Sequence, residues 1–333
     1  MPTFCRHNRL VQNCPICSRE QSIALRPIVT SSAPRASVAA PRTPAPGAGA
    51  PRATGAGRTG IRVRRLARGA DDGYRSRLAP GLKSSEDAER LAEELAFAAG
   101  RLRVLEQHPP GLYAQVAAAD SDIEERTWLA FLLAYLCPVD GEDPFAPARA
   151  AWVSWSSGAE PLLDGVQTGP RTAHEPDRAA ATIDAYRAWA QRAGSQAAAF
   201  GGEDAWTPER RFARVFERLA LPGFHRDARF DLLVTLGRLR VYELRAGSLQ
   251  IGGANEPTLA AKRILGIGDS LLLERRASEL AQACELPLEA LDLGFYNWGR
   301  GKRATLGLGP SAQPDPDALA SIRAGLGLPG EAE

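Results

Sequence analysis

The sequence has no apolar run approaching the roughly 20 residues that a membrane-spanning helix needs, and its first residues lack the apolar core of a secretory signal. Cysteine is scarce, with 5 in 333 residues, and both Cys137 and Cys284 stand alone in predicted helical segments. Such isolated thiols do not form a disulfide framework, which a reducing compartment would not maintain. We therefore expect a cytoplasmic protein with no membrane partner.

Lysine is nearly absent, since only Lys83, Lys262 and Lys302 occur among 41 basic residues. Together with abundant Ala and Gly, this composition is typical of a GC-rich bacterial genome, so the preference for arginine indicates no particular chemistry. Aromatic residues make up only 7% of the chain and hydrophobic residues 44%. These fractions suit one globular domain of ordinary size together with a less ordered part.

Positive charge is concentrated near the N-terminus. Residues 1–80 hold 14 Arg and 3 acidic residues, a charge of +11, whereas residues 81–333 carry −9. The sequence therefore predicts three regions: a zinc-binding knot over 1–25, a flexible basic linker over 26–80, and a helical domain over 81–333.

The N-terminal knot is predicted from four residues that can bind a metal ion and that lie within 13 positions: Cys5, His7, Cys14 and Cys17. The two-residue spacing of the last pair lets both thiolates reach one tetrahedral zinc ion. A closed set of four protein ligands predicts a structural Zn2+ site, and the metal would supply most of the segment's folding free energy. The alternatives are a disordered basic tail with incidental cysteines and, less favoured because no βαβ pattern follows, a redox-active pair.

The linker is rich in Pro, Ala, Gly, Ser and Arg and has almost no periodic apolar residue. Such a segment cannot bury enough surface to offset its chain entropy, so we expect no fixed structure there. Its arginines cluster near the end: Arg58, Arg62, Arg64, Arg65 and Arg68. They are equally suited to phosphate contacts and to simple solvation.

Apolar residues at helical spacing, with capping residues before them, predict a mainly α fold for the rest of the chain. The expected helices are about 84–106, 123–136, 147–155, 177–193, 208–220, 226–239, 258–265, 270–284, 287–298 and 316–326. Strand signals are confined to short pieces at 241–244 and 248–251.

Two tight glycine turns separate short predicted helices, one at residues 221–224 and one at 265–268. Such a turn leaves backbone N–H groups free at the start of the second helix, where the helix dipole favours a DNA phosphate. The candidate DNA contacts are Gly223, Phe224, His225 and Arg226 at the first turn, and Gly266, Gly268 and Ser270 at the second.

A basic run after the second turn adds further candidate DNA contacts: Asn297, Trp298, Arg300, Lys302 and Arg303. The charged members, flanked by glycines, suit phosphate contacts, with solvated loop charge as the alternative. The alternative for the tryptophan is a place in the helix core.

The stretches RFARVFERLALPGFHRDARFDLL at 211–233 and KRILGIGD at 262–269 resemble the helix-hairpin-helix DNA glycosylase superfamily. More narrowly, they resemble the branch named α-glutamyl/putrescinyl thymine pyrophosphorylases, over roughly residues 85–305. The superfamily hairpin reads Leu-Pro-Gly-Val-Gly. Here the first turn has His225 in place of the second glycine, and the second turn lacks the proline, so either turn could take the phosphate-binding place.

This resemblance implies a helical DNA-binding domain that acts on a hypermodified base. Some relatives are bacterial phage-defence glycosylases that remove modified, for instance glucosylated, pyrimidines from phage DNA. The resemblance therefore predicts an enzyme whose partner is double-stranded DNA with modified bases, and we expect a monomer. The alternatives are a base-hypermodifying transferase acting on activated thymine, a non-catalytic DNA-binding protein, and a zinc-dependent adaptor that contacts protein.

Cleavage of an N-glycosidic bond gives the sugar oxocarbenium character, so the site needs a carboxylate beneath it and a pocket for the extruded base. In the superfamily a catalytic aspartate follows the hairpin by about twenty residues. Asp292, which lies 24 residues beyond Gly268, is the first candidate. If the first turn is the functional hairpin, Glu243 and Asp231 are the candidates. Each of them could equally be a surface acid.

Bifunctional glycosylases form a Schiff base through a lysine just after the hairpin, and this sequence has none there. The resemblance therefore predicts a monofunctional enzyme that leaves an abasic site. The apolar segment 128–136 is the candidate pocket wall, with Trp128 and Tyr135 against the base. Its alternative is plain hydrophobic core.

Overall fold

The computed structural model describes residues 69–329, which lie in one compact unit spanning Val63–Glu333. The predicted zinc ligands and most of the predicted linker lie outside the described residues. The helices are α2 (Ser85–Gln107), α3 (Leu112–Ala117), α4 (Ile123–Leu136), α5 (Ala146–Ala151), α6 (Ala179–Arg192), α7 (Gln196–Gly201), α8 (Pro208–Arg218), α9 (Arg226–Arg238), α10 (Glu256–Leu265), α11 (Ser270–Ala283), α12 (Leu288–Arg300) and α13 (Pro316–Leu326), with a 3-10 turn, η2, at Pro176–Arg178. The mainly α fold class is thus confirmed.

Capping residues set several helix starts. The carboxylate of Asp122 accepts from the Glu124 amide at 2.9 Å before α4, and Thr207 caps α8, whose first residue is Pro208. Asp315 caps α13 by accepting from the Ala318 amide at 2.9 Å. Side-chain oxygens at these positions satisfy amides that have no partner within the helix.

Two expectations for local structure were wrong. The described residues contain no strand, and the strand signals at 241–244 and 248–251 fall in the connection between α9 and α10. In that connection the Leu249 and Ile251 amides donate to the Glu274 carboxylate rather than to a neighbouring strand. The helix expected over 147–155 ends at Ala151, because the chain turns so that the Val153 carbonyl accepts the indole N–H of Trp128.

The helical body also begins earlier than residue 81. Ala79 is fully buried, and the Gly81 amide donates to the Ile264 carbonyl at 2.9 Å. A Cβ atom at Gly81 would lie 1.8 Å from the Arg263 carbonyl oxygen, so only glycine fits this approach to α10. Residues 69–80, expected as the end of the linker, are therefore part of the folded body.

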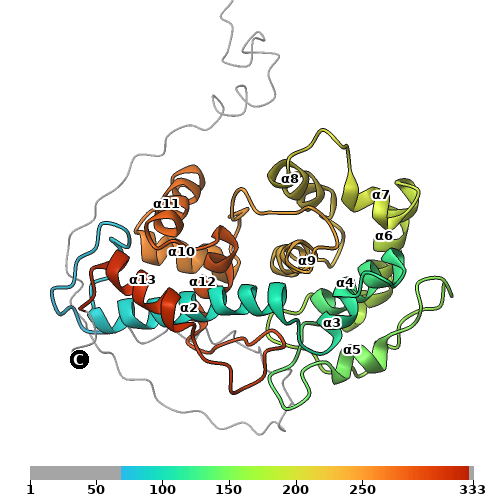
Figure 1. Cartoon of the computed structure of the whole chain (residues 1–333), viewed down its shortest axis with the longest axis horizontal. Helices are drawn as coiled ribbons and strands as arrows, with labels where there is room; N and C mark the ends of the chain where they lie inside the picture. The colour runs from blue at the N-terminus through green and yellow to red at the C-terminus, as the bar shows by residue number, and fades with distance from the viewer. Residues whose placement is uncertain (1–68, 330–333) are drawn as a thin grey trace, which may run out of the picture. The chain divides into compact units, whose positions relative to one another are not determined.

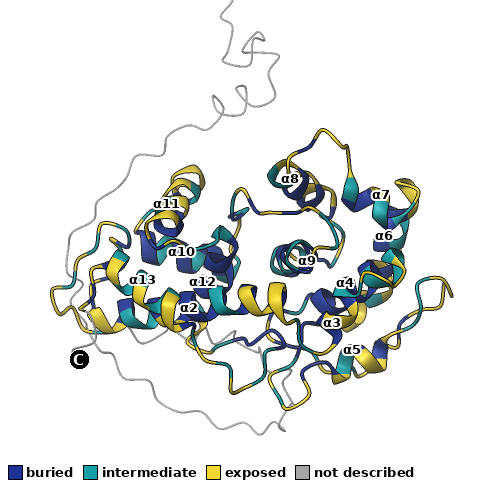
Figure 2. Cartoon of the chain, in the orientation of Figure 1, coloured by how far each residue is buried: buried dark blue, intermediate teal, exposed yellow. Residues whose placement is uncertain are grey.

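The helices form two groups that α2 joins. In one group α12 packs on α2 and α10, α13 packs on α2, and α11 packs on α10 and α12. In the other group α4 packs on α3, α7 and α9, and α8 packs on α9. Figure 1 shows α2 running past both groups. α2 also packs against α9. Figure 2 shows that α12 is buried along most of its length, whereas α11 is largely exposed.

Candidate active site

Asp292 is buried in the second turn of α12, with only 2% of its surface exposed. Every residue of α12 from Glu289 to Trp298 is buried, because the helix packs between α2 and α10. A carboxylate in such a place is stable as an anion only when it is paired and hydrogen-bonded. The partners of Asp292 therefore define the site.

Two arginines from distant parts of the chain hold this carboxylate. Arg171, in the loop before η2, donates from Nη2 to Asp292 Oδ2 at 2.6 Å. Arg226, the first residue of α9, donates from Nη1 to Asp292 Oδ1. The side chain of Arg171 is fully buried and that of Arg226 is 9% exposed.

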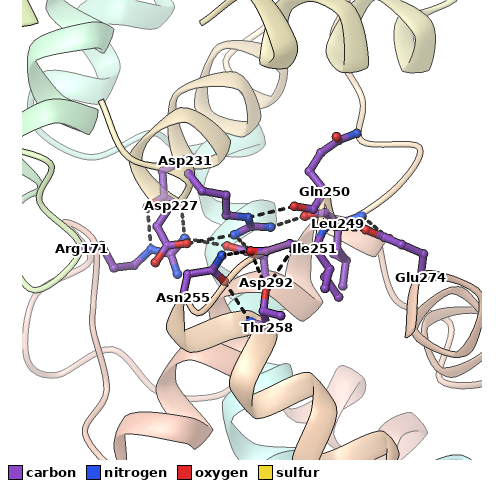
Figure 3. Close-up of polar contacts among 12 residues, drawn as sticks. Arg171, Asp227, Asp231, Leu249, Gln250, Ile251, Asn255, Thr258, Glu274 and Asp292 are labelled. Atoms are coloured by element: carbon purple, nitrogen blue, oxygen red, sulfur yellow. Dashed lines mark hydrogen bonds and ion pairs between the residues drawn. The ribbon is translucent and has the colours of Figure 1, made fainter. Parts of the chain in front are cut away.

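Two further aspartates on α9 complete the arrangement, as Figure 3 shows. Asp231 accepts from Arg171 Nε at 2.7 Å and from Nη2 at 3.0 Å, and Asp227 lies 3.2 Å from Arg226 Nη1. These residues are four positions apart and so face the same side of the helix. We call Arg171, Arg226, Asp227, Asp231 and Asp292 the Asp292 cluster.

Burial and pairing have opposite effects on the charges of this cluster. Burial raises the pKa of Asp231, against the opposing effect of the Arg171 guanidinium. Burial acts to lower the pKa of Arg171, but Asp231 and Asp292 outweigh it and hold that pKa well above its usual value. Arg171 therefore stays charged, and its Nη1 is buried without a hydrogen-bond partner among the described residues.

The three predicted catalytic carboxylates differ in their positions in the structure. Asp231 and Asp292 come together through Arg171, although they were proposed from different hairpins. The side chain of Glu243 is 81% exposed and lies 3.3 Å from Arg211 Nη1, away from both. The geometry therefore favours Asp292, with Asp231 as its neighbour, over Glu243.

The second glycine turn is the more open of the two. Gly266 ends α10 with a φ of 66°, and nothing lies within 4 Å of a Cβ built at Gly268. Ser270, the first residue of α11, is exposed. The preceding Asp269 caps α11 by accepting from the Leu272 amide at 3.0 Å. The backbone of the second glycine turn is thus accessible, although the Asp269 carboxylate lies beside it.

The first glycine turn packs against other helices. A Cβ at Gly223 would lie 2.2 Å from Thr182 Oγ1 of α6, and Phe224 is 2% exposed with its ring 5.1 Å from that of Phe131. His225 is exposed and lies 3.0 Å from Glu175. Arg226, expected to contact DNA, turns inward to Asp292. Of the residues proposed at this turn, only His225 faces outward.

The basic run also contains both buried and exposed residues. Asn297 and Trp298 are buried: the Asn297 side-chain amide donates to Glu94 at 3.1 Å, and the Trp298 indole donates to the Asp87 carbonyl at 3.0 Å. Arg303 pairs with Glu94 at 2.9 Å. Arg300 and Lys302 are exposed, with Lys302 Nζ 3.6 Å from Asp140 Oδ2 and the Arg300 guanidinium 5.8 Å from the centre of the Tyr296 ring.

The two residues proposed for the base pocket have different surroundings. Trp128 is fully buried, with ring centroids 5.4 Å from Phe131 and 5.8 Å from Tyr186, which is the geometry of a packed core. The Tyr135 hydroxyl lies 3.1 Å from Nδ1 of His174, in the loop that supplies Arg171. Burial lowers the pKa of His174. Tyr135 is also fully buried, with its ring 5.7 Å from that of Phe131, but it contacts the loop that supplies Arg171.

Within residues 69–329 there is no group of three or more His, Cys, Asp or Glu side chains placed to hold a metal ion. The predicted ligands Cys5, His7, Cys14 and Cys17 lie outside that range. In the same range no helix is long and apolar enough to cross a membrane.

Burial raises the pKa of Cys137 to about 12 and that of Cys284 to about 11, so neither thiol is a reactive nucleophile.

All members of the Asp292 cluster lie between residues 170 and 300. This segment matches the family model described as Alpha-glutamyl/putrescinyl thymine pyrophosphorylase clade 3. The predicted resemblance to this branch is confirmed over that segment. The match associates the chain with enzymes of thymine modification, over the segment that carries both glycine turns and the cluster. No curated protein and no solved structure matches the chain.

Sequence reasoning missed two members of the cluster. Asp227 could have been found, because it shares a helix face with Asp231 at the i, i+4 spacing. Arg171 gave no signal, since it lies 121 positions from Asp292 in an irregular loop. Only the three-dimensional fold brings these residues together.

Proposed function

We propose that this protein is a DNA N-glycosylase that excises a hypermodified pyrimidine and leaves an abasic site. Asp292 would stabilise the positive charge that develops on the sugar as the glycosidic bond breaks. The proposed substrate is double-stranded DNA, with phage DNA in the bacterial cytoplasm as the setting and antiviral defence as the role. The observation that carries this proposal is the buried, doubly paired Asp292 inside the family segment.

The charge of the cluster favours a cationic transition state. Its three aspartates and two arginines carry a formal charge of −1 when all are ionised. With Arg101, whose charge also acts on Asp231, the positive and negative charges are equal when all of these groups are ionised. Such an environment suits a sugar cation better than it suits an anionic leaving group.

The arginines would fix the carboxylate and meet the substrate. Arg171 and Arg226 occupy one oxygen each of Asp292, which fixes the orientation of the carboxylate. The unpaired Nη1 of Arg171 needs an oxygen acceptor, which water or substrate would supply. Asp227 and Asp231, with 17% and 15% of their side chains exposed, are the most accessible members of the cluster.

The second candidate is a transferase that exchanges a group on an activated thymine. The description of the matching family favours it, because a pyrophosphorylase acts on a pyrophosphate-bearing base. The lack of surplus positive charge at the Asp292 cluster counts against it, since departing pyrophosphate would need cationic partners. A non-catalytic DNA-binding protein is the third outcome that an experiment must distinguish.

The test incubates full-length protein with duplex DNA containing thymine, 5-hydroxymethyluracil or glucosylated 5-hydroxymethylcytosine. Strand breaks after alkali, with free modified base identified by mass spectrometry, support the glycosylase. A change in base mass within intact strands supports the transferase, and retention on DNA with neither product supports a binding protein. Asp292→Asn should abolish excision, whereas Asp184→Asn, at an exposed aspartate on α6, should not.

A further inference from the structure

Gln250 has an unfavourable backbone conformation next to the Asp292 cluster. Its φ is 53°, in the left-handed region that favours glycine and is uncommon for a residue with a long side chain. Residues held in this region persist only when their surroundings fix them, and they concentrate at functional sites. The contacts around Gln250 must therefore hold this backbone conformation in place.

Charged side chains form hydrogen bonds with the backbone on both sides of Gln250. The Glu274 carboxylate accepts from the Leu249 amide at 2.7 Å and from the Ile251 amide at 2.6 Å. Arg226 donates to the Leu249 carbonyl and, at 3.5 Å, to the Gln250 carbonyl. The same Arg226 holds Asp292. The left-handed backbone is thus fixed by residues that also build the candidate active site.

The side chain of Gln250 plays little part in this arrangement. Figure 3 shows it projecting away from the carboxylates of the cluster. Its amide donates to Ser248 Oγ at 2.8 Å, a contact within the same loop. Glycine would adopt this backbone with less strain and would keep every backbone contact described above. The fold therefore has no need of the amide, which remains available to a ligand.

We propose that Gln250 reads the edge of a DNA base when a nucleotide occupies the Asp292 cluster. A primary amide presents a donor and an acceptor in one plane, which allows two parallel hydrogen bonds to a base edge. The Arg226 side chain contacts both the Gln250 carbonyl and the Asp292 carboxylate, so DNA bound at the cluster would lie near Gln250. This inference rests on the proposed function and adds to it a residue that determines specificity.

The test replaces Gln250 with glycine and, separately, with asparagine. Gln250→Gly should lower kcat/KM by about tenfold, because two hydrogen bonds to the base are lost. Its Tm should stay equal or rise, because glycine relieves the strained backbone. Gln250→Asn keeps a shorter amide and should retain more activity than the glycine variant. The matched control is Glu285→Gly, at an exposed residue with a φ of 54°, which should leave kcat/KM unchanged.

Substrate design identifies which base is read. Each variant is assayed on single-stranded DNA and on duplexes in which the base opposite the modified pyrimidine is varied. A loss that persists on single strands assigns the contact to the target base, and a loss confined to duplexes assigns it to the opposite base. Either loss supports the proposal.

Binding separates this proposal from the proposed function. The ratio of Kd for unmodified and modified duplex is measured for wild type and Gln250→Gly. If wild type has no activity but its binding preference disappears in Gln250→Gly, the glycosylase proposal fails and base reading stands. If Gln250→Gly matches wild type in both kcat/KM and Kd ratio, base reading is refuted.

Discussion

Replacement of Asp292 with asparagine separates the chemical role of this residue from its structural role. The carboxylate is 2% exposed and pairs with two arginines, so the change removes one anion from each guanidinium group and leaves Arg171 with Asp231 and Arg226 with Asp227. Breaking a buried ion pair costs about 3–5 kcal/mol, and asparagine, which still accepts a hydrogen bond, should fall near about 3 kcal/mol. For a domain of this size the Tm should fall by about 6–12 °C.

The effect on catalysis should be much larger than the effect on folding. Loss of the negative charge beneath the sugar should lower kcat by about 10²–10⁴-fold at a temperature where the variant is folded. Excision is measured as released base against time, and folding by thermal denaturation of the same samples. Retention on DNA should stay near the wild-type level, because Asp292 contributes no positive charge.

Asp231→Asn is the matched comparison for this experiment. Asp231 pairs with the same Arg171 and is also on a helix, so its loss should destabilise the fold to a similar degree. It should lower kcat by no more than about tenfold, because Asp292 keeps its charge. Equal losses of kcat in the two variants, or full activity in Asp292→Asn, would refute the assignment.

Three further predictions rest on the geometry of the folded body, and a fourth rests on the N-terminal sequence. Glu243→Gln should excise at the wild-type rate, because that side chain is 81% exposed; a large loss of kcat would restore it as a candidate. Ser270→Glu should raise or preserve the Tm, since an acid suits the start of α11, yet weaken DNA retention at low salt several-fold; unchanged retention would exclude this turn from the interface. Burial lowers the pKa of His174, so its folded state resists protonation and its contribution to stability, present above pH 6.5, is lost as pH falls; the drop in Tm from pH 7.5 to 5.5 should be smaller in His174→Gln, and an equal drop would contradict this. Full-length protein should contain one zinc ion, which Cys14→Ser loses; a metal-free wild type would refute the N-terminal site.

Much of the fold could be predicted because its signals are local. The bounds of α4 and α13 follow from a capping aspartate and a run of helix-forming residues, all close together in the chain. α3 and α7 were missed because six residues are too few to show a helical period. The strand signal at 248–251 failed because Glu274, outside that loop, takes the amides that a strand would pair. The signal at 241–244 failed because the Val241 and Leu244 amides bond to the nearby Leu236 and Tyr242 carbonyls.

The candidate site could be predicted only in part. Asp292 was predicted from its spacing after a glycine turn, which says nothing about the side chains around it. Glu243 was nominated by the same reasoning from the other turn, and sequence spacing carries no information about exposure. Arg171 illustrates the limit most clearly, because its pairing with Asp231 joins residues 60 positions apart. Such contacts arise from packing between helix groups, which periodicity does not encode.

The most direct test of the central claim compares free modified base with abasic sites in a reaction of wild-type protein and modified duplex DNA. Wild type should release one free base for each abasic site, and Asp292→Asn should form neither product. Recovery of a base with altered mass in unbroken strands, or of abasic sites with Asp292→Asn at the wild-type rate, would contradict it.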